Sequence, residues 1–158
     1  MRMLSNRKDD MSEYTPKNLD FERTVRDFVL NMPVAKLYGF HFGQISPGYV
    51  ETIQPYRKEL SHQEGYFQGS VIGAIADFAG APAALTLLAP GWGGATVDFT
   101  VKIVAPAQGD RLIARGRVIR SGSVLTVSSV DVYACVGPKE TLCACAFVTV
   151  RNFPPTKG

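Results

Sequence analysis

HQEGYFQGSVIGAIADFAGAPAALTLLAP, residues 62–90, is the most apolar stretch of this 158-residue chain, and it decides how the rest can fold. Apart from one glutamate near its start, the only residue in the stretch that is charged at pH 7 is Asp77. Residues 68–88 would be apolar on almost every side of a helix, so we expect a long, buried helix there. Pro82 lacks the N–H that would donate to the carbonyl of Phe78, so we expect a kink or an early end near it.

Two patterned regions precede this segment. Residues 20–31 carry apolar side chains at helical spacing, with Asp20 as the expected N-cap and Pro33 as a stop signal. Residues 36–60 are typical of two short strands joined by a Ser-Pro-Gly turn at 46–48.

After residue 94 the apolar period changes to two, which predicts strands. On the first of them the apolar side chains alternate with polar ones: Val97, Phe99, Val101 and Ile103 against Thr96, Asp98, Thr100 and Lys102. Further strands follow at 110–120, 123–135 and 141–153, and their short connections predict a meander of consecutive antiparallel strands. Such a sheet must cover its apolar face, and the buried helix is the available cover. The sequence therefore predicts an α+β fold, with a sheet curled around one central helix.

The composition, with 46% hydrophobic and 20% charged residues, is that of a globular protein. The length suits a single domain, which we place at residues 18–153. A polar leader at 1–17, expected to be flexible, precedes it, and a short tail at 154–158 follows. The net charge of +3 comes from scattered Arg and Lys, which argues against nucleic-acid binding and leaves room for an anionic small ligand.

We expect neither secretion nor a membrane segment. The first residues are charged and polar without the apolar core of a signal peptide, and Asp77 with its neighbouring Gly and Pro residues interrupts the apolar run. The three cysteines, Cys135, Cys143 and Cys145, are then expected to be reduced thiols. They form no CxxC pair and have no suitably spaced His, so no metal site is expected. The predicted location is the cytoplasm.

Residues 62–70, His-Gln-Glu-Gly-Tyr-Phe-Gln-Gly-Ser, lead into the Val-Ile-Gly-Ala-Ile-Ala-Asp segment that ends at Asp77. This text resembles the Asn-x-x-Gly-x-x-His-Gly-Gly stretch and the following Ala-Asp helix of the hotdog-fold PaaI-like acyl-CoA thioesterases. The resemblance extends over about residues 35–152. Three positions depart from the family pattern, with His62 in place of Asn, Gln68 in place of His and Ser70 in place of the second Gly.

The resemblance implies that Asp77 activates water as a general base or attacks the thioester directly. An aspartate in apolar surroundings has a raised pKa, which suits the first role. Small residues at three- and four-residue steps around it would leave space for a substrate; they are Ser70, Gly73, Ala74, Gly80 and Ala81. Two structural alternatives stay open. The carboxylate could cap a backbone or pair with an Arg, and the small residues could simply let the sheet approach the helix.

Polarisation of the thioester carbonyl is expected at the start of the helix, where the N–H groups of Gly69 and Ser70 are free and the helix dipole favours an oxyanion. By the resemblance, Gln68 would orient the carbonyl through its amide, and His62 would donate a hydrogen bond to it. Thr96 matches a hydroxyl that helps to place the water, expected to come from the neighbouring subunit. Each also has a plainer interpretation, as a helix cap, a loop residue or a strand residue.

Coenzyme A brings phosphates, so basic residues are expected near the entrance of the site. The turn formed by Arg120, Ser121 and Gly122 matches the one that the family places near the pantetheine arm. Further basic candidates are Arg115, Arg117 and Lys102. The resemblance also implies a homodimer or homotetramer with the active site at the subunit interface, and no cofactor.

The leading interpretation is therefore an acyl-CoA thioester hydrolase. One alternative is a non-catalytic acyl-CoA-binding hotdog protein, which the absence of the usual His and Asn supports. The other is a hotdog hydratase or dehydratase, which would need His62 and Asp77 as an acid–base pair.

Overall fold

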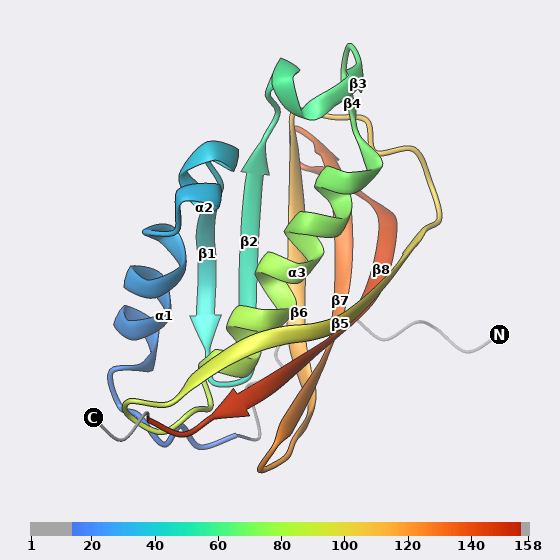
Figure 1. Ribbon diagram of the computed structural model, residues 1–158. Helices are drawn as coiled ribbons and strands as arrows, with labels where there is room; N and C mark the ends of the chain where they lie inside the picture. The colour runs from blue at the N-terminus through green and yellow to red at the C-terminus, as the bar shows by residue number, and fades with distance from the viewer. Residues whose placement is uncertain (1–13, 156–158) are drawn as a thin grey trace, which may run out of the picture.

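The computed structural model describes residues 14–155, and within them one curled sheet wraps around one long helix. This helix, α3, lies across the concave face of the sheet, while two shorter helices lie beside one edge (Figure 1). The predicted α+β hotdog architecture is thus confirmed. The elements are α1 (Phe21–Leu30), α2 (Pro33–Tyr38), β1 (His41–Ser46), β2 (Tyr49–Pro55), a 3-10 turn (Lys58–Leu60), β3 (Ser61–Gln63), β4 (Tyr66–Phe67), α3 (Gly69–Leu85), β5 (Gly93–Ile103), β6 (Arg111–Ser121), β7 (Leu125–Val136) and β8 (Lys139–Phe153).

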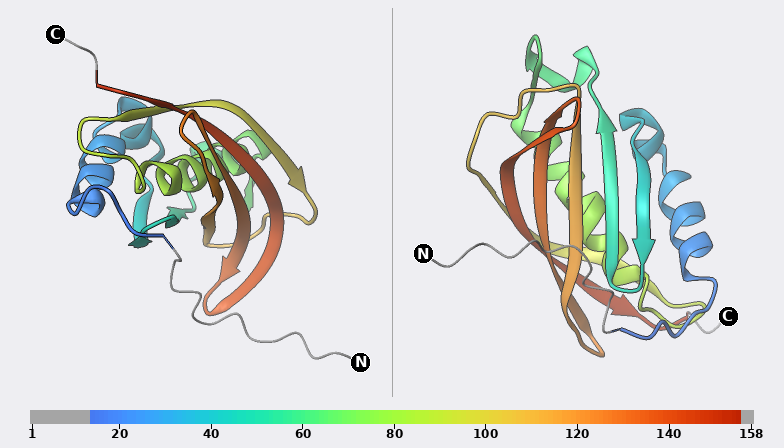
Figure 2. Two further views of the ribbon diagram at one scale, coloured as in Figure 1. Left: turned by 90° about the horizontal axis from the view of Figure 1, so that it is seen from below. Right: turned by 180° about the vertical axis from the view of Figure 1, so that it is seen from behind.

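The order of the strands differs from the predicted meander. The sheet runs β1-β2-β6-β7-β8-β5, and every neighbouring pair is antiparallel. Strands β6, β7 and β8 do form a meander, but β5 lies on the far side of β8, at the edge of the sheet (Figure 2). The seven-residue connection 104–110 leads from β5 across the end of the sheet, past β8 and β7, to β6. Its short length therefore did not mean that the two strands it joins are neighbours.

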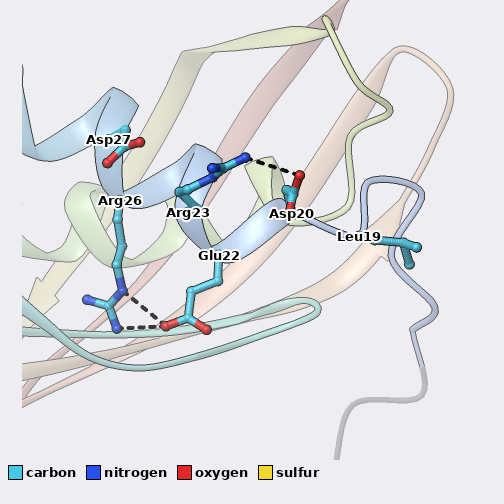
Figure 3. A pocket seen from close by; sticks show the side chains of 6 residues that line it. All are labelled: Leu19, Asp20, Glu22, Arg23, Arg26 and Asp27. Atoms are coloured by element: carbon cyan, nitrogen blue, oxygen red, sulfur yellow. Dashed lines mark hydrogen bonds and ion pairs between the residues drawn. The ribbon is translucent and has the colours of Figure 1, made fainter.

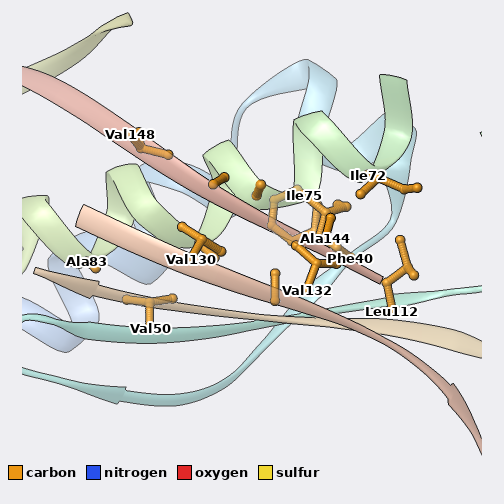
Figure 4. Packing of buried hydrophobic residues seen from close by; sticks show 14 of the residues in the cluster. Phe40, Val50, Ile72, Ile75, Ala83, Leu112, Val130, Val132, Ala144 and Val148 are labelled. Atoms are coloured by element: carbon orange, nitrogen blue, oxygen red, sulfur yellow. The ribbon is translucent and has the colours of Figure 1, made fainter. Parts of the chain in front are cut away.

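The helix α3 packs closely against the sheet because glycines lie where the two meet, one on the helix and one on a strand. A Cβ atom at Gly116 of β6 would clash with the carbonyl oxygen of Ala79, and one at Gly80 would lie 2.7 Å from the side chain of Val148. Around this contact, apolar side chains from the helix and the sheet form the core (Figure 4). Among the small residues predicted to line one face of the helix, Gly80 therefore lets the sheet pack closely on the helix.

The helix continues through Pro82 and ends three residues later, at Leu85. Pro82 leaves the carbonyl of Phe78 without a donor from its own helix. The hydroxyl of Thr52, a buried residue of β2, donates to this carbonyl at 2.7 Å. A hydrogen bond from the sheet thus replaces the one that proline removes.

The N-terminal elements follow the sequence pattern with two changes. Asp20 occupies the N-cap position of α1, but its carboxylate makes no cap hydrogen bond and pairs with Arg23 at 3.2 Å. Pro33 does not only end a helix, because it is also the first residue of α2. Most of the predicted leader, residues 1–13, lies outside the described residues, as does the end of the tail, 156–158; the domain limits stay a prediction. No helix within residues 14–155 is long and apolar enough to cross a membrane.

Replacing Thr52 with Val should destabilise the fold, because the Phe78 carbonyl then loses its donor while it stays buried. We expect the free energy of unfolding, measured by urea denaturation, to fall by about 1–3 kcal/mol. Thr52→Ser keeps the hydroxyl and serves as the control, with a smaller loss. A Thr52→Val variant as stable as the wild type, with the larger loss in Thr52→Ser, would show that the methyl group, and not the hydrogen bond, matters here.

Candidate active site

Asp77 lies half-buried near the middle of α3, and Thr96 of β5 is its hydrogen-bond partner. The Thr96 hydroxyl donates to Oδ1 of Asp77 at 2.8 Å. Burial raises the pKa of Asp77 above its ordinary value of 3.8, and the hydrogen bond from Thr96 offsets part of this increase. Within residues 14–155 no Arg, Lys or His forms an ion pair with Asp77. An ion pair with another described residue is therefore not what holds this carboxylate.

Thr96 faces Asp77 because β5 contains a bulge at Val97. In the pairing with β8, Thr96 lies opposite Val150 and Asp98 opposite Thr149, so Val97 is an extra residue without a partner. The predicted alternation, which placed Thr96 on the opposite face from Phe99, is therefore wrong before the bulge. Thr96 shares the inner face of the sheet with Phe99, and both lie opposite buried valines of β8. Thr96 and Asp77 belong to one chain, so this hydrogen bond needs no neighbouring subunit; the contribution of Thr96 to the site of a neighbouring subunit stays a prediction.

One turn before Asp77, Gly73 faces β5. A Cβ atom at this glycine would lie 3.7 Å from the ring of Phe99 and 3.9 Å from Val101. The ring of Phe99 remains 47% exposed and Ile103 remains 52% exposed, although both face the helix side. Apolar surface that is only partly covered thus adjoins the carboxylate along β5.

The start of α3 is capped by Gln68, and this changes which donors are free. Its Oε1 atom accepts hydrogen bonds from both the backbone N–H and the hydroxyl of Ser70. The N–H of Ser70, expected to be free, is therefore used. Within the described residues, the N–H of Gly69 and the Nε2 amide of Gln68 have no hydrogen-bond partner. Since Oε1 is held by Ser70, the opposite end of the amide, Nε2, points away from it.

His62 lies on the hairpin formed by β3 and β4, directly before α3. The backbone N–H of Gln68 donates to the carbonyl of Leu60, which fixes this hairpin beside the start of the helix. The His62 side chain is exposed, and its ring centroid lies 5.9 Å from that of Tyr66. It makes no side-chain hydrogen bond in the part of the chain that the structure describes. The fold brings His62 to the same end of α3 as Gln68, but not into contact with Asp77.

Arg120, Ser121 and Gly122 lie at the opposite end of the sheet. Strand β6 begins near the loop before α3, where the N–H of Tyr56 donates to the carbonyl of Asp110. It then runs for 11 residues, or about 30 Å, before it reaches Ser121. Within one chain, this turn and the start of α3 are therefore too far apart to contact the same thioester group.

The other basic candidates are on the outer face of the sheet and two of them are occupied. Arg115 pairs with Glu51 at 2.9 Å and with Glu140 at 2.6 Å. The guanidinium of Arg117 lies 4.6 Å from the ring centroid of Tyr49. Lys102, the third of them, is exposed, as is Arg120, and neither forms an ion pair within residues 14–155.

A cleft of about 350 Å³ on α1 contains none of the predicted site residues (Figure 3). Its charged side chains neutralise one another, for example Arg26 with Glu22 at 3.0 Å. Among the described residues no His, Cys, Asp and Glu side chains gather as a metal site would require. Burial raises the pKa of the Cys143 thiol to about 11, so this cysteine stays protonated at neutral pH.

Solved structures with the same fold include several thioesterases. A thioesterase family protein from Silicibacter pomeroyi is 29% identical with a TM-score of 0.82, over 85% of this chain and 98% of that one. A thioesterase from Haemophilus influenzae is 18% identical with a TM-score of 0.74, over 93% and 96%. The PaaI protein of the phenylacetic acid degradation operon of E. coli is 17% identical with a TM-score of 0.75, over 87% and 96%.

No protein-family model matches the sequence, and no curated protein is similar to it. The structural matches nevertheless confirm the resemblance to the hotdog-fold PaaI-like thioesterases. At the level of the family they support a thioesterase.

Asp77→Asn should gain stability relative to the wild type as the pH rises. Below pH 3.8 the carboxyl is protonated in both the folded and unfolded chain, so the two proteins differ least there. At higher pH the unfolded wild type ionises first, because the folded pKa is raised, and this favours unfolding. Asparagine does not titrate, so the effect is absent in the variant. The measurement is the free energy of unfolding by urea across this pH range.

The opposite trend, a variant that becomes relatively less stable with rising pH, would mean that a favourable partner holds the ionised carboxylate. The structural alternative for Asp77 would then be correct.

Proposed function

We propose that this chain is an acyl-CoA thioester hydrolase in which Asp77 acts as general base or as nucleophile. The observation that carries the proposal is the half-buried carboxylate of Asp77, which has a raised pKa and a hydroxyl partner but no cation within the described chain. It lies on the central helix of a fold that thioesterases share. A carboxylate in this state holds a proton more readily than an exposed one, which suits acid–base work near neutral pH.

Thr96 leaves half of the carboxylate available for the reaction. Its hydroxyl donates to Oδ1, so Oδ2 can accept a proton from water. The water oxygen then attacks the carbonyl carbon, the carbon–sulfur bond breaks, and the thiolate leaves and takes up the proton from Asp77. In the nucleophilic route Oδ2 itself attacks and the thiolate leaves, and water hydrolyses the resulting anhydride.

Two donors at the start of α3 fit the carbonyl oxygen of a thioester, but they lie eight residues, about 12 Å along the helix, from Asp77 of the same chain. We therefore assign them to a thioester that Asp77 of a second copy attacks. The N–H of Gly69, which has no partner among the described residues, lies at the positive end of the helix dipole, and the Nε2 amide of the preceding residue, Gln68, is the second donor. Ser70 takes part by holding Oε1 of Gln68, which makes it a positioning residue rather than a direct substrate contact. His62, at the same end of the helix, is the proposed second side-chain donor.

A second copy of the chain would complete the site. Strand β5 is the edge of the sheet, so one row of its backbone hydrogen-bonding groups is unpaired, and Val97, Phe99 and Ile103 are exposed along it. Pairing of two such edges would give a homodimer, and stacking of dimers a homotetramer. Since Arg120 is far from the start of α3 in its own chain, we assign it, with Ser121 and Gly122, to the thioester held at the start of α3 of the partner.

A non-catalytic acyl-CoA-binding protein is the second candidate, because capping by Gln68 uses one backbone donor that a hydrolase would employ. A hydratase is less well supported, since His62 and Asp77 lie on different elements without a hydrogen bond between them.

Asp77→Asn should lower kcat for an acyl-CoA substrate at least about 100-fold, because it removes the base or nucleophile while keeping the shape of the side chain. The assay mixes purified protein with aliphatic and aromatic acyl-CoAs and follows the release of free thiol. A folded wild type that binds acyl-CoA but releases no thiol from any of them would make the chain a binding protein.

Gln68→Ala should lower kcat by a smaller factor, about 5- to 30-fold, with KM nearly unchanged, since the amide acts mainly in the transition state. Gln63→Ala, an exposed glutamine on the same hairpin, is the matched control and should keep full activity. If both variants behave alike, Gln68 has no part in the reaction.

A further inference from the structure

The turn between β6 and β7, which we call the β6–β7 tip (residues 119–125), carries three large apolar side chains in the open. Ile119 is 53% exposed, Val124 59% and Leu125 45%. A bulge at Ile119 precedes the turn, because Val118 lies opposite Ser128 whereas Arg120 lies opposite Val127. The bulge changes the face on which Arg120 and the residues after it emerge.

One buried residue of a different strand holds this turn. Asn152 of β8 is only 7% exposed, and its Nδ2 atom donates to the carbonyl of Gly122 at 2.9 Å and to the hydroxyl of Thr126 at 3.2 Å. Its backbone N–H donates to the carbonyl of Val124 at 2.8 Å. Asn152 therefore fixes two carbonyls of the turn, that of Gly122 through its side chain and that of Val124 through its main chain.

The turn is also constrained from within. The N–H of Gly122 donates to the carbonyl of Leu125 at 2.9 Å, and a Cβ atom at Gly122 would lie 2.7 Å from that same oxygen. A side chain at residue 122 would push the two strands apart. A buried carboxamide is costly unless its hydrogen bonds are made, so this network fixes one shape of an exposed turn.

The exposed side of the tip matches the chemistry of a thioester carrier. Arg120 has no ion-pair partner within the described residues, and Arg151 lies beside Leu125 in the register of β7 and β8. The guanidinium of Arg151 lies 5.4 Å from the ring centroid of Phe153, whereas that of Arg120 has no partner among the described residues. Apolar side chains next to an unpaired guanidinium group fit a ligand with a methyl-bearing arm that ends in phosphates. The pantetheine arm and nucleotide of coenzyme A have this composition.

We propose that Asn152 is a positioning residue for the carrier half of the thioester: it holds the β6–β7 tip in the shape that binds the pantetheine arm and the phosphates. This proposal rests on the proposed hydrolase function. Asn152 lies opposite Gly94 of β5, two residues before Thr96, and makes no hydrogen bond with Thr96 or Asp77; its side-chain hydrogen bonds go to Gly122 and Thr126. Its loss therefore weakens binding of the carrier and leaves the bond-breaking step unchanged.

The test compares one acyl group on three carriers: coenzyme A, pantetheine and N-acetylcysteamine, the last of which lacks the arm beyond the first amide. For Asn152→Leu we expect KM to rise about 5- to 10-fold for the first two carriers, with kcat unchanged. This factor corresponds to the loss of the one or two side-chain hydrogen bonds with which Asn152 orders the tip. KM for the N-acetylcysteamine thioester should stay the same. Arg120→Ala should raise KM for acyl-CoA alone.

Two further variants keep the test decisive if Asn152→Leu folds poorly. Gly122→Ala disturbs the turn while Asn152 itself stays unchanged, and it should reproduce the same pattern of KM values. Ser128→Ala, a buried residue of the neighbouring β7 whose hydroxyl has no partner in the described chain, should change none of the three KM values.

Equal changes for all three carriers, or a fall in kcat, would show that Asn152 serves only the stability of the sheet, and would overturn the proposal. So would a wild type that hydrolyses the three thioesters with the same KM, although the hydrolase function would then stand. A wild type that hydrolyses none of them contradicts the proposed function itself.

Discussion

The close contact between α3 and the sheet is the constraint on which the other features depend. Gly116 and Gly80 allow the backbones of helix and sheet to approach to a distance that no side chain would permit. At this distance the sheet has to curl around the helix, and Thr52 comes near enough to donate to the carbonyl that Pro82 leaves free. The same approach brings the edge strand β5 against the other side of the helix, where Asp77 lies.

Asp77 is held under unfavourable conditions for a charge. Burial raises its pKa, and the single hydroxyl of Thr96 offsets only part of that effect. A carboxylate that served stability would be expected to have a cation nearby, as Glu51 and Glu140 have in Arg115. The contrast between the two sites supports a role for Asp77 in chemistry, because free energy that is lost in folding can be recovered in a transition state.

The sequence predicted the central helix, the long strands and the curled architecture, since hydrophobic period and turn residues are local signals. It failed for the order of strands, because nothing local distinguishes a connection between neighbours from one that crosses the sheet to place β5 beside β8. The capping role of Gln68 stayed an open alternative for a related reason: a glutamine and a serine two residues apart can each face the solvent equally well. Asn152 gave no signal at all, as a single asparagine in a strand has no pattern around it.

The bulge in β5 has a consequence for how such a site can change over evolution. Val97 is 55% exposed and has no partner in β8, yet the presence of a residue at this place turns Thr96 toward the helix. What matters is the number of residues between Thr96 and Phe99 rather than their identity. Many substitutions at position 97 would therefore be neutral, whereas a one-residue deletion there would rotate Thr96 out of the site and leave the rest of the strand in register.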